Sequence, residues 1–318
     1  MNLVEINETI LAISESVNTV IRLYPIITLD NGTDEIRLAD ITDDAGDELK
    51  KMLLDYLLNK FNNNPELSFL DLTQADSRKN AAYLYDIVEK PEVLQMLAEI
   101  LQNSNKPAFS FDDDDISKIT GFIILIGDAT SRMTLYKRHH HLSTMKANKS
   151  FSLFRSVDRF EKVEEDILRL SGHVDFLQIE DDLIVTNLGA LESTFGYEEV
   201  IRKQAQTNIE HIQGLNLLED IAPLIEMAQD LKSAKKILKV KLDSPVTQLP
   251  VATVINFVKS HKPIMKKFRL SEDGNRLKLD TLVSKKLFLA LMNDDLLTSE
   301  LTQLYYEGVA KDKMDIEE

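Results

Sequence analysis

Residues 118–139 read KITGFIILIGDATSRMTLYKRH, and this stretch decides the fold class. Its two apolar parts, KITGFIILIGD and RMTLYKRH, are typical of β-strands, and the small polar residues DATS between them are typical of a turn. The sequence therefore predicts a strand, a turn and a second strand near the middle of the chain.

Further strands are predicted after this hairpin. FSLFR, residues 151–155, is a candidate third strand. HVDFLQI and LIVTN lie on either side of the polar residues EDD and predict another hairpin over residues 173–187. In FRLSEDGNRLKLD, residues 268–280, the pair Asp273-Gly274 supplies the turn of one more hairpin.

Helices are predicted on both sides of these strands. GDELKKMLLDYLLNKF (46–61) and KPEVLQMLAEILQ (90–102) carry apolar residues at helical spacing, and Pro91 suits the first turn of the second helix. Asp158, with Glu161 three residues later, predicts a helix over residues 158–170. After Gly189 the pattern is mostly helical, including the segment SAKKILKVKL.

Strands followed by helices, without strict alternation, indicate an α+β fold. We expect an acidic, helix-rich N-terminal region, central β-hairpins that form a small mixed sheet, and a mainly helical C-terminal part. The segment NSNKPAFSFDDDD (103–115) interrupts the helical pattern. It predicts a boundary between an N-terminal region, residues 1–107, and an α+β core, residues 108–318, that carries the basic surfaces.

The composition excludes several classes of site and location. The chain has no cysteine, which excludes disulfides, zinc-thiolate sites and cysteine nucleophiles. Its first residues, MNLVEINETI, are acidic where a signal peptide would be basic. The longest apolar run, GFIILIG, is far shorter than the roughly 20 residues that span a bilayer. We therefore expect a cytoplasmic protein without a transmembrane segment.

The net charge of −16 conceals a strong segregation of charge along the chain. Residues 1–128 contain 10 basic and 24 acidic side chains, whereas residues 232–286 contain 14 basic and 4 acidic ones. Residues 129–162 are also basic. This distribution predicts an anion-binding face on an acidic body.

Three consecutive histidines, His139 to His141, lie within the first basic stretch. Strand alternation sends His139 and His141 to one face and His140 to the other. Two histidines at this spacing can share a metal ion, but the sequence offers no HExxH motif and no clustered carboxylates to complete the site. We expect no metal and no cofactor, and we interpret these histidines as polar residues that raise the local positive potential.

The lysines and arginines favour contacts with the phosphate backbone of double-stranded DNA, with little sequence preference. The second basic stretch places four lysines at positions i, i+3, i+4 and i+7, which is one stripe along a helix. No aromatic residues are interleaved with them, so a stacking platform for single strands is not indicated. The expected contacts come from two surfaces. Basic surface 1 comprises Arg132, Lys137, Arg138, Lys146 and Lys149, and basic surface 2 comprises Lys232, Lys235, Lys236, Lys239, Lys262, Lys266 and Lys267.

Two other functions remain open. A metal-dependent nuclease could assemble its carboxylates only in the fold, but the Glu-x-Lys sequence at Glu48 to Lys50 lies in a predicted helix rather than on a strand. The segment FDDDDIS (111–117) lacks the ligand spacing of a calcium loop and is typical of a solvated turn and cap. No catalytic motif is visible, so we expect no enzyme activity. The second alternative is an adaptor that docks on a membrane protein or on an anionic membrane surface through the same lysines.

One stretch carries a resemblance to a known family. FLQIEDDLIVTNLGALESTFGYEEVIRK (176–203) and MTLYKRHHHLSTMKANKSFSLFR (133–155) together resemble the KwaB family, over about residues 110–300 and, in length and order, over the whole chain. Proteins of that family are the cytoplasmic components of Kiwa, a two-gene anti-phage system of bacteria. The resemblance implies a DNA-binding effector that blocks phage DNA replication and transcription.

The resemblance also implies partners. It implies a small multi-spanning membrane protein, KwaA, which would hold this chain at the inner face of the membrane. We expect a homodimer, both from the resemblance and from the general prevalence of such assemblies among soluble proteins.

Overall fold

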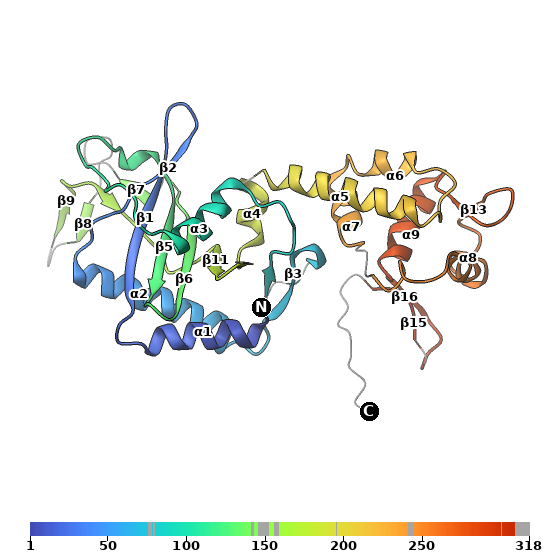
Figure 1. Ribbon diagram of the computed structural model, residues 1–318, viewed down its shortest axis with the longest axis horizontal. Coiled ribbons are helices and arrows are strands. Elements are labelled where there is room, and N and C mark those ends of the chain that lie inside the picture. Colours follow the sequence, from blue (N-terminus) through green and yellow to red (C-terminus); the bar gives the residue numbers. More distant parts are fainter. Residues whose placement is uncertain are drawn as a thin grey trace. The chain divides into compact units, whose positions relative to one another are not determined.

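The computed structural model describes residues 1–75, 78, 80–140, 143–145, 153–155, 159–194, 196–240, 244–299 and 301–308 (Figure 1). The chain forms two compact units. Unit 1 contains residues 1–72, 78–86 and 90–195, and unit 2 contains residues 73–77, 87–89 and 196–318. The fold has both helices and strands, as the α+β prediction requires.

An eight-stranded sheet forms the centre of unit 1, in the order β2-β1-β5-β6-β11-β12-β4-β3. Its middle is the predicted hairpin, β5 (Ile119–Gly127) and β6 (Arg132–Arg138), which pair antiparallel. The second predicted hairpin is also confirmed, as β11 (Phe176–Ile179) and β12 (Asp182–Val185). All neighbours are antiparallel except β3 and β4, which are parallel.

The N-terminal third supplies half of this sheet, with β1 (Val20–Thr28), β2 (Asp34–Ile36), β3 (Ser68–Asp71) and β4 (Ala81–Leu84). The expected boundary between residues 107 and 108 therefore falls inside unit 1, because β1 pairs with β5 along nearly its whole length. Pro25 in β1 has no N–H to donate, and its carbonyl accepts from the Arg37 N–H just beyond β2. The chain beyond β2 still follows β1, since the Ala39 N–H donates to the Leu23 carbonyl, so Pro25 removes only one donor at this edge.

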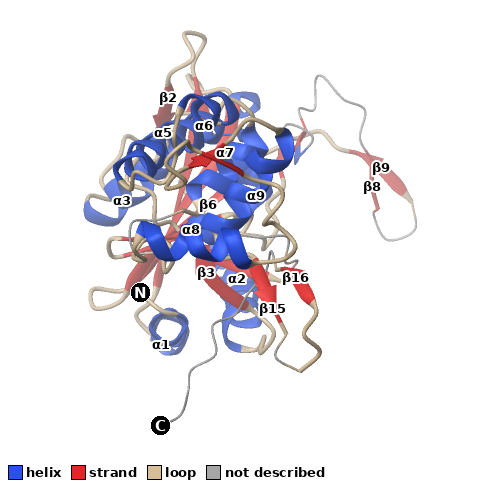
Figure 2. Cartoon of the chain, turned by 90° about the vertical axis from the view of Figure 1, so that its right-hand side faces the viewer, coloured by secondary structure: helices blue, strands red, loops and turns tan. Residues whose placement is uncertain are grey.

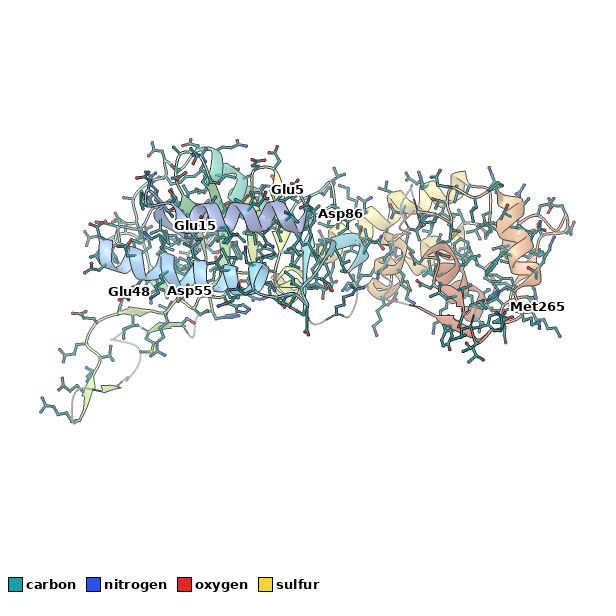
Figure 3. All side chains as sticks on the ribbon, turned by 90° about the horizontal axis from the view of Figure 1, so that it is seen from below. Glu5, Glu15, Glu48, Asp55, Asp86 and Met265 are labelled. Carbon is teal, nitrogen blue, oxygen red and sulfur yellow. The ribbon has the colours of Figure 1, made fainter. Side chains whose placement is uncertain are left out.

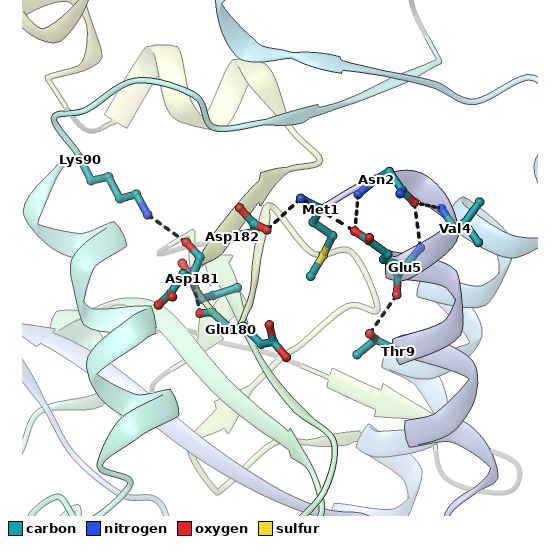
Figure 4. Close-up of polar contacts among 10 residues, drawn as sticks. Met1, Asn2, Val4, Glu5, Thr9, Lys90, Glu180, Asp181 and Asp182 are labelled. Carbon is teal, nitrogen blue, oxygen red and sulfur yellow. Dashed lines mark hydrogen bonds and ion pairs between the residues drawn. The ribbon is translucent and has the colours of Figure 1, made fainter.

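Helices cover the two faces of the sheet. On one face lie α1 (Leu3–Glu15) and α2 (Asp43–Leu57), which continues as the π-helix η1 (Leu58–Asn62). Asn2 caps α1, because its side chain accepts from the backbone N–H groups of Val4 and Glu5 (Figure 4). On the other face lies α3 (Glu92–Gln102), with Pro91 at its N-cap, one residue before the first turn in which the sequence predicts it. A carbonyl of α3, that of Leu97, accepts a hydrogen bond at 3.0 Å from the Thr134 hydroxyl of β6.

The described residues of the connection from β6 to β11 form four short strands, β7 (Thr144–Met145), β8 (Leu153–Arg155), β9 (Phe160–Lys162) and β10 (Ile167–Leu168). The candidate strand at residues 151–155 is confirmed as β8. The helix predicted over residues 158–170 is wrong, since β9 pairs with β8 and β10 pairs with β7. Strand pairing, within a local hairpin for β8 and β9 and over a longer separation for β7 and β10, overrides the capping pattern here. The short 3₁₀ turns η2 (Leu72–Gln74) and η3 (Ile116–Lys118) and the helix α4 (Leu188–Thr194) complete the regular elements before residue 196.

Unit 2 is mainly helical (Figure 2). Its helices are α5 (Tyr197–Gly214), α6 (Ala222–Met227), α7 (Leu231–Leu238), α8 (Val251–Ser260) and α9 (Leu282–Met292). The predicted Asp273-Gly274 turn is confirmed, since it joins β13 (Arg269–Leu270) to β14 (Leu277–Lys278) and Gly274 has a φ of 71°. A last hairpin pairs β15 (Leu296–Thr298) with β16 (Tyr305–Glu307).

Two short segments from the first third of the chain belong to unit 2. Gln74 donates from its side chain to the Lys239 carbonyl at 3.2 Å, and Glu89 forms an ion pair with Lys203 of α5. Across the residues that the structure describes, no helix is both long and apolar enough to cross a bilayer.

Candidate nucleic-acid interface

The predicted lysine stripe lies on α7. Asp230 caps this helix by accepting from the Ser233 N–H at 3.0 Å, and Asn208 of α5 donates to the carbonyls of Ile237 and Leu238 at its other end. The residues that bury against the unit are Ala234, Ile237 and Leu238. The helical period then directs the four lysines of the stripe, Lys232, Lys235, Lys236 and Lys239, to the opposite side.

Exposure differs along this stripe. Lys232 is exposed, whereas Lys235, Lys236 and Lys239 are half-buried. A half-buried lysine commonly packs its apolar stem on the protein and keeps its ammonium in water. The stripe therefore offers positive charge along one face of α7, but it is not a row of freely extended side chains.

The turn that follows α8 presents the most open positive charge. In the segment HKPIMKKF (261–268), Ile264 and Phe268 are buried and fix the backbone. The N–H of Ile264 donates to the His261 carbonyl at 3.1 Å, and the N–H of Lys267 donates to that of Ile264 at 2.8 Å. Around these anchors the side chains are exposed, with Lys262 before Ile264 and with Met265, Lys266 and Lys267 between Ile264 and Phe268. Figure 3 labels Met265 on this turn.

None of the lysines on this turn forms an ion pair in the described part of the chain. Other cations of unit 2 are neutralised: Arg269 pairs with Asp280 at 3.1 Å, Lys278 with Glu219 at 2.9 Å, and Lys285 with Glu226 at 2.8 Å. Three unpaired ammonium groups within six residues repel one another unless an anion lies between them. This turn is therefore the part of basic surface 2 best suited to a polyanion.

Three further exposed cations of unit 2 also carry no ion pair among the described residues: Lys259, Arg276 and Lys286. They are not part of basic surface 2 as the sequence predicts it. Lys259 ends α8, and its ammonium lies 3.8 Å from the position that a side chain on Gly274 would occupy. These three cations could have been found from the sequence, because they lie in the segment 232–286, where basic residues are in excess.

Basic surface 1 does not form as expected. On β6 the side chains alternate, so Lys137 points to the α1 and α2 face with Met133 and Leu135, whereas Arg132 and Arg138 point to the other face. Lys137 is only 8% exposed, and its ammonium donates to the Ser171 hydroxyl at 2.7 Å and to the His173 carbonyl at 2.8 Å. Burial lowers the pKa of the Lys137 ammonium, against a smaller opposing effect of Asp175. Lys137 is thus a buried cation and not part of a surface.

The other residues of basic surface 1 are dispersed. Arg132 is exposed at the start of β6, and Arg138 is half-buried at its end, about 20 Å away for a strand of this length. Arg138 donates to the Ser193 hydroxyl at 3.1 Å and lines a cavity rather than an open face. Lys146 and Lys149 lie outside the described residues.

The histidines are separated in the same way. His139 is 7% exposed and shares a hydrogen bond of 2.6 Å with the Thr144 hydroxyl, while His140 is exposed and His141 lies outside the described residues. Burial, followed by the nearby His140 and Lys137, lowers the pKa of His139. Among the residues that can be described, no three histidine, aspartate or glutamate side chains gather as a metal site.

The acidic side chains occupy caps, turns and the outside of two helices. In the tetra-aspartate segment, Asp115 caps η3 by accepting from the Ser117 N–H at 2.8 Å, and Asp114 lies 3.5 Å from Arg37. The predicted turn and cap are therefore confirmed there. Glu48 lies on α2, so the predicted helix around the Glu-x-Lys sequence is confirmed. Figure 3 shows the exposed carboxylates of α1 and α2 along this side of unit 1, where it labels Glu5, Glu15, Glu48 and Asp55.

Comparisons with known proteins identify the family of this chain. A family model described as Kiwa protein KwaB-like matches residues 116–302, which is more than half of the chain. The Kiwa protein KwaB of Escherichia coli O55:H7 (strain RM12579 / EPEC) is 29% identical over 290 residues, which cover 88% of this chain and 90% of that protein. No solved structure matches the chain.

Proposed function

Because the chain belongs to the Kiwa protein KwaB-like family, we propose that it acts in Kiwa anti-phage defence by binding double-stranded DNA through unit 2. The observation that supports this proposal is the exposed turn after α8, where Lys262, Lys266 and Lys267 carry no ion pair among the described residues. Lysines bind phosphate as point charges and do not discriminate between bases. The proposed binding is therefore largely independent of sequence.

The stripe on α7 extends the proposed contact. Its exposed member, Lys232, and the half-buried Lys235, Lys236 and Lys239 add positive potential in the same unit. This positive potential steers an anionic ligand toward unit 2. The carboxylates of the acidic helices in unit 1 repel the same ligand. Bound to DNA in this way, the protein would obstruct replication and transcription of phage DNA without catalysis.

The family resemblance supplies the remaining parts of the proposal. We expect the membrane protein KwaA as the partner that holds the chain at the inner face of the membrane, and a homodimer as the working assembly. Co-purification with KwaA and sedimentation of the isolated protein test these two expectations separately.

The decisive test is a salt series of binding to a short DNA duplex. The logarithm of the binding constant falls linearly with the logarithm of salt concentration, by about 0.9 for each phosphate neutralised. The double variant Lys266→Gln/Lys267→Gln removes two such contacts, so we expect the slope to become shallower by about 1.8. The matched control is Lys50→Gln/Lys51→Gln on the acidic helix α2, which should leave both affinity and slope unchanged.

Other results would point to the alternatives. Equal slopes for all three proteins would place the DNA elsewhere. Absence of binding at low salt, together with flotation on anionic liposomes that the Lys266→Gln/Lys267→Gln variant loses, would favour an adaptor at the membrane. Nicking of supercoiled plasmid with Mg²⁺ or Mn²⁺ would favour the nuclease.

A further inference from the structure

A cavity of about 290 Å³ with a mixed polar and apolar lining lies in unit 1, on the face of the sheet that α3 covers. Strands β1, β2, β5 and β6 and the start of α3 supply its walls. Its volume equals the share of about ten water molecules in the liquid, and it is at the lower end of the range for ligand pockets. The function proposed above does not use this cavity.

Arg138 supplies a guanidinium to the lining of the cavity, and the buried imidazole of His139, which follows β6, also lines it. Arg138 reaches it because β6 alternation turns this side chain away from the α1 and α2 face. In the described part of the chain, this guanidinium has one hydrogen-bond partner, Ser193, and no ion pair. A guanidinium has five N–H donors, so most of its capacity remains for a planar anionic group such as a phosphate or carboxylate.

A carboxylate lines the same cavity without pairing with Arg138. Asp34 of β2 accepts from the Thr28 hydroxyl at 2.5 Å and carries no ion pair among the described residues. The Thr28 hydroxyl in turn lies 3.2 Å from that of Thr120. A charged acceptor held apart from a charged donor, with hydroxyls beside it, suits a ligand that has an anionic group at one end and N–H or O–H donors at the other.

Tyr136 forms one wall, and glycine at position 121 is what admits it. A Cβ atom on Gly121 would lie 2.8 Å from the Tyr136 hydroxyl oxygen, so no other residue fits beneath this ring. Burial raises the pKa of Tyr136 well above its usual value, and the phenol therefore keeps its proton. Ile26 and Val93 add apolar surface to the lining. These groups give a flat ring both an apolar wall and an aromatic edge to pack against.

We propose that this cavity binds a nucleoside monophosphate, with the phosphate at Arg138 and the donors of the nucleoside at Asp34. An inorganic phosphate would fill only a small part of the volume and would leave Asp34 without a donor. A small amino acid would satisfy both charges but would leave the apolar wall unused. The proposal is independent of DNA binding, because no residue of basic surface 2 lies in unit 1.

Isothermal titration of the full chain with AMP tests this site. We expect Arg138→Gln to weaken AMP binding about tenfold or more, since it removes the charge-assisted hydrogen bonds to phosphate. The matched control is Arg132→Gln, which changes the same residue type at the exposed end of the same strand, and its affinity should stay within about twofold of wild type. Adenosine should bind wild type and Arg138→Gln equally, and more weakly than AMP binds wild type.

A second variant covers the case in which Arg138→Gln fails to fold. Thr120 is exposed at the edge of the cavity, so Thr120→Leu should fold normally while obstructing entry and abolishing AMP binding. No AMP binding to wild type at millimolar concentration would overturn the proposal. Equal AMP affinity in wild type, Arg138→Gln and Thr120→Leu would also overturn it, as would binding of glutamate or glycine in place of AMP.

Discussion

Lys137 and Arg138 are neighbours in the sequence, yet they face opposite sides of the same strand. The Lys137 ammonium is held by a hydroxyl and a carbonyl, with no carboxylate in an ion pair among the described residues. The Arg138 guanidinium lines a cavity on the other side of the sheet. A buried ammonium that lacks an ion pair costs stability unless its hydrogen bonds offset the loss of water. The role of Lys137 is therefore structural.

Substituting Lys137 should change stability without changing DNA affinity. Lys137→Ala leaves the Ser171 hydroxyl and the His173 carbonyl without their partner, and we expect it to lower the free energy of unfolding by about 1–3 kcal/mol. Lys137→Met keeps the apolar stem and removes the buried charge, so its loss should be smaller. Urea denaturation measures both. A salt slope for DNA binding that becomes shallower in either variant would contradict this assignment.

The same residue predicts a dependence on alkaline pH. The pKa of Lys137 in the folded chain lies below its usual value of 10.5, so the unfolded chain binds more protons between these two pKa values. The free energy of unfolding of wild type should therefore rise with pH in this window, relative to that of Lys137→Met. Parallel urea titrations from neutral pH to pH 10.5 test this, and a constant difference between the two proteins would refute it.

At the scale of elements, one carboxylate organises the hairpin on which the sheet is built. Asp128 accepts four hydrogen bonds, which come from the Ser16 hydroxyl at 2.6 Å, the Thr130 N–H and hydroxyl at 2.8 and 2.7 Å, and the Ser131 N–H at 2.9 Å. These bonds, with the Ser16 hydroxyl first, hold the pKa of Asp128 far below its usual value. They also connect the end of α1 to the turn between β5 and β6.

Asp128→Ala should therefore lower the melting temperature, and Asp128→Asn should lower it less because the amide oxygen still accepts. The folded pKa is depressed, so the contribution of Asp128 is fully present above its usual pKa of 3.8 and is lost as pH falls below that value. Melting curves from pH 3 to pH 7 should show a constant difference between wild type and Asp128→Ala near neutral pH, and a difference that begins to narrow below about pH 4 without closing by pH 3. The control is Asp112→Ala, an exposed carboxylate that should have little effect at any pH.

At the scale of the whole molecule, the opposite charges belong to different units. The acidic helices α1 and α2 are in unit 1, and the described lysines of basic surface 2 are in unit 2. The proposed nucleotide cavity lies in unit 1 and the proposed DNA contacts lie in unit 2. Each ligand should then stabilise mainly the unit that it binds.

Calorimetry of the full chain should resolve this arrangement as two transitions. A short duplex at 100 times its dissociation constant should stabilise unit 2 by about 2.7 kcal/mol and leave the other transition in place. AMP should do the reverse. A single transition that both ligands shift equally would contradict independent units.

Several features of this fold follow from local sequence. The β5 and β6 hairpin follows from two apolar runs on either side of the turn residues DATS, and α7 follows from the helical spacing of its lysines. The sequence predicts helices and no strand in the N-terminal third, whereas β1 forms there by pairing with β5 and β2, which are contributed by other parts of the chain. The capping pattern at Asp158 fails because β9 pairs with the neighbouring strand β8 and β10 pairs with β7, more than 20 residues earlier.

The candidate sites, like the fold, can be predicted only in part from local sequence, because the rest depends on contacts between distant segments. The lysines of the α8 turn are identified by charge alone, but their freedom from ion pairs depends on where Glu219, Glu226 and Asp280 place their carboxylates. The alternation of β6 separates Lys137 from Arg138, but which of the two is buried depends on α1 and α2. The cavity forms where the edge strand β2 and the helix α3 lie beside β1, β5 and β6. No local sequence pattern predicts that these elements come together.

Unit 2 draws two of its segments from the first third of the chain, and this has a consequence for synthesis and for engineering. The ribosome makes residues 73–77 and 87–89 long before α5 and α7, so the last helices complete their packing on chain that already exists. A fragment that starts at residue 196 would lack the Gln74 donor for the Lys239 carbonyl and the Glu89 partner of Lys203. The basic unit therefore cannot be moved between proteins as a simple C-terminal cassette; a transplant has to carry both inserted segments with it.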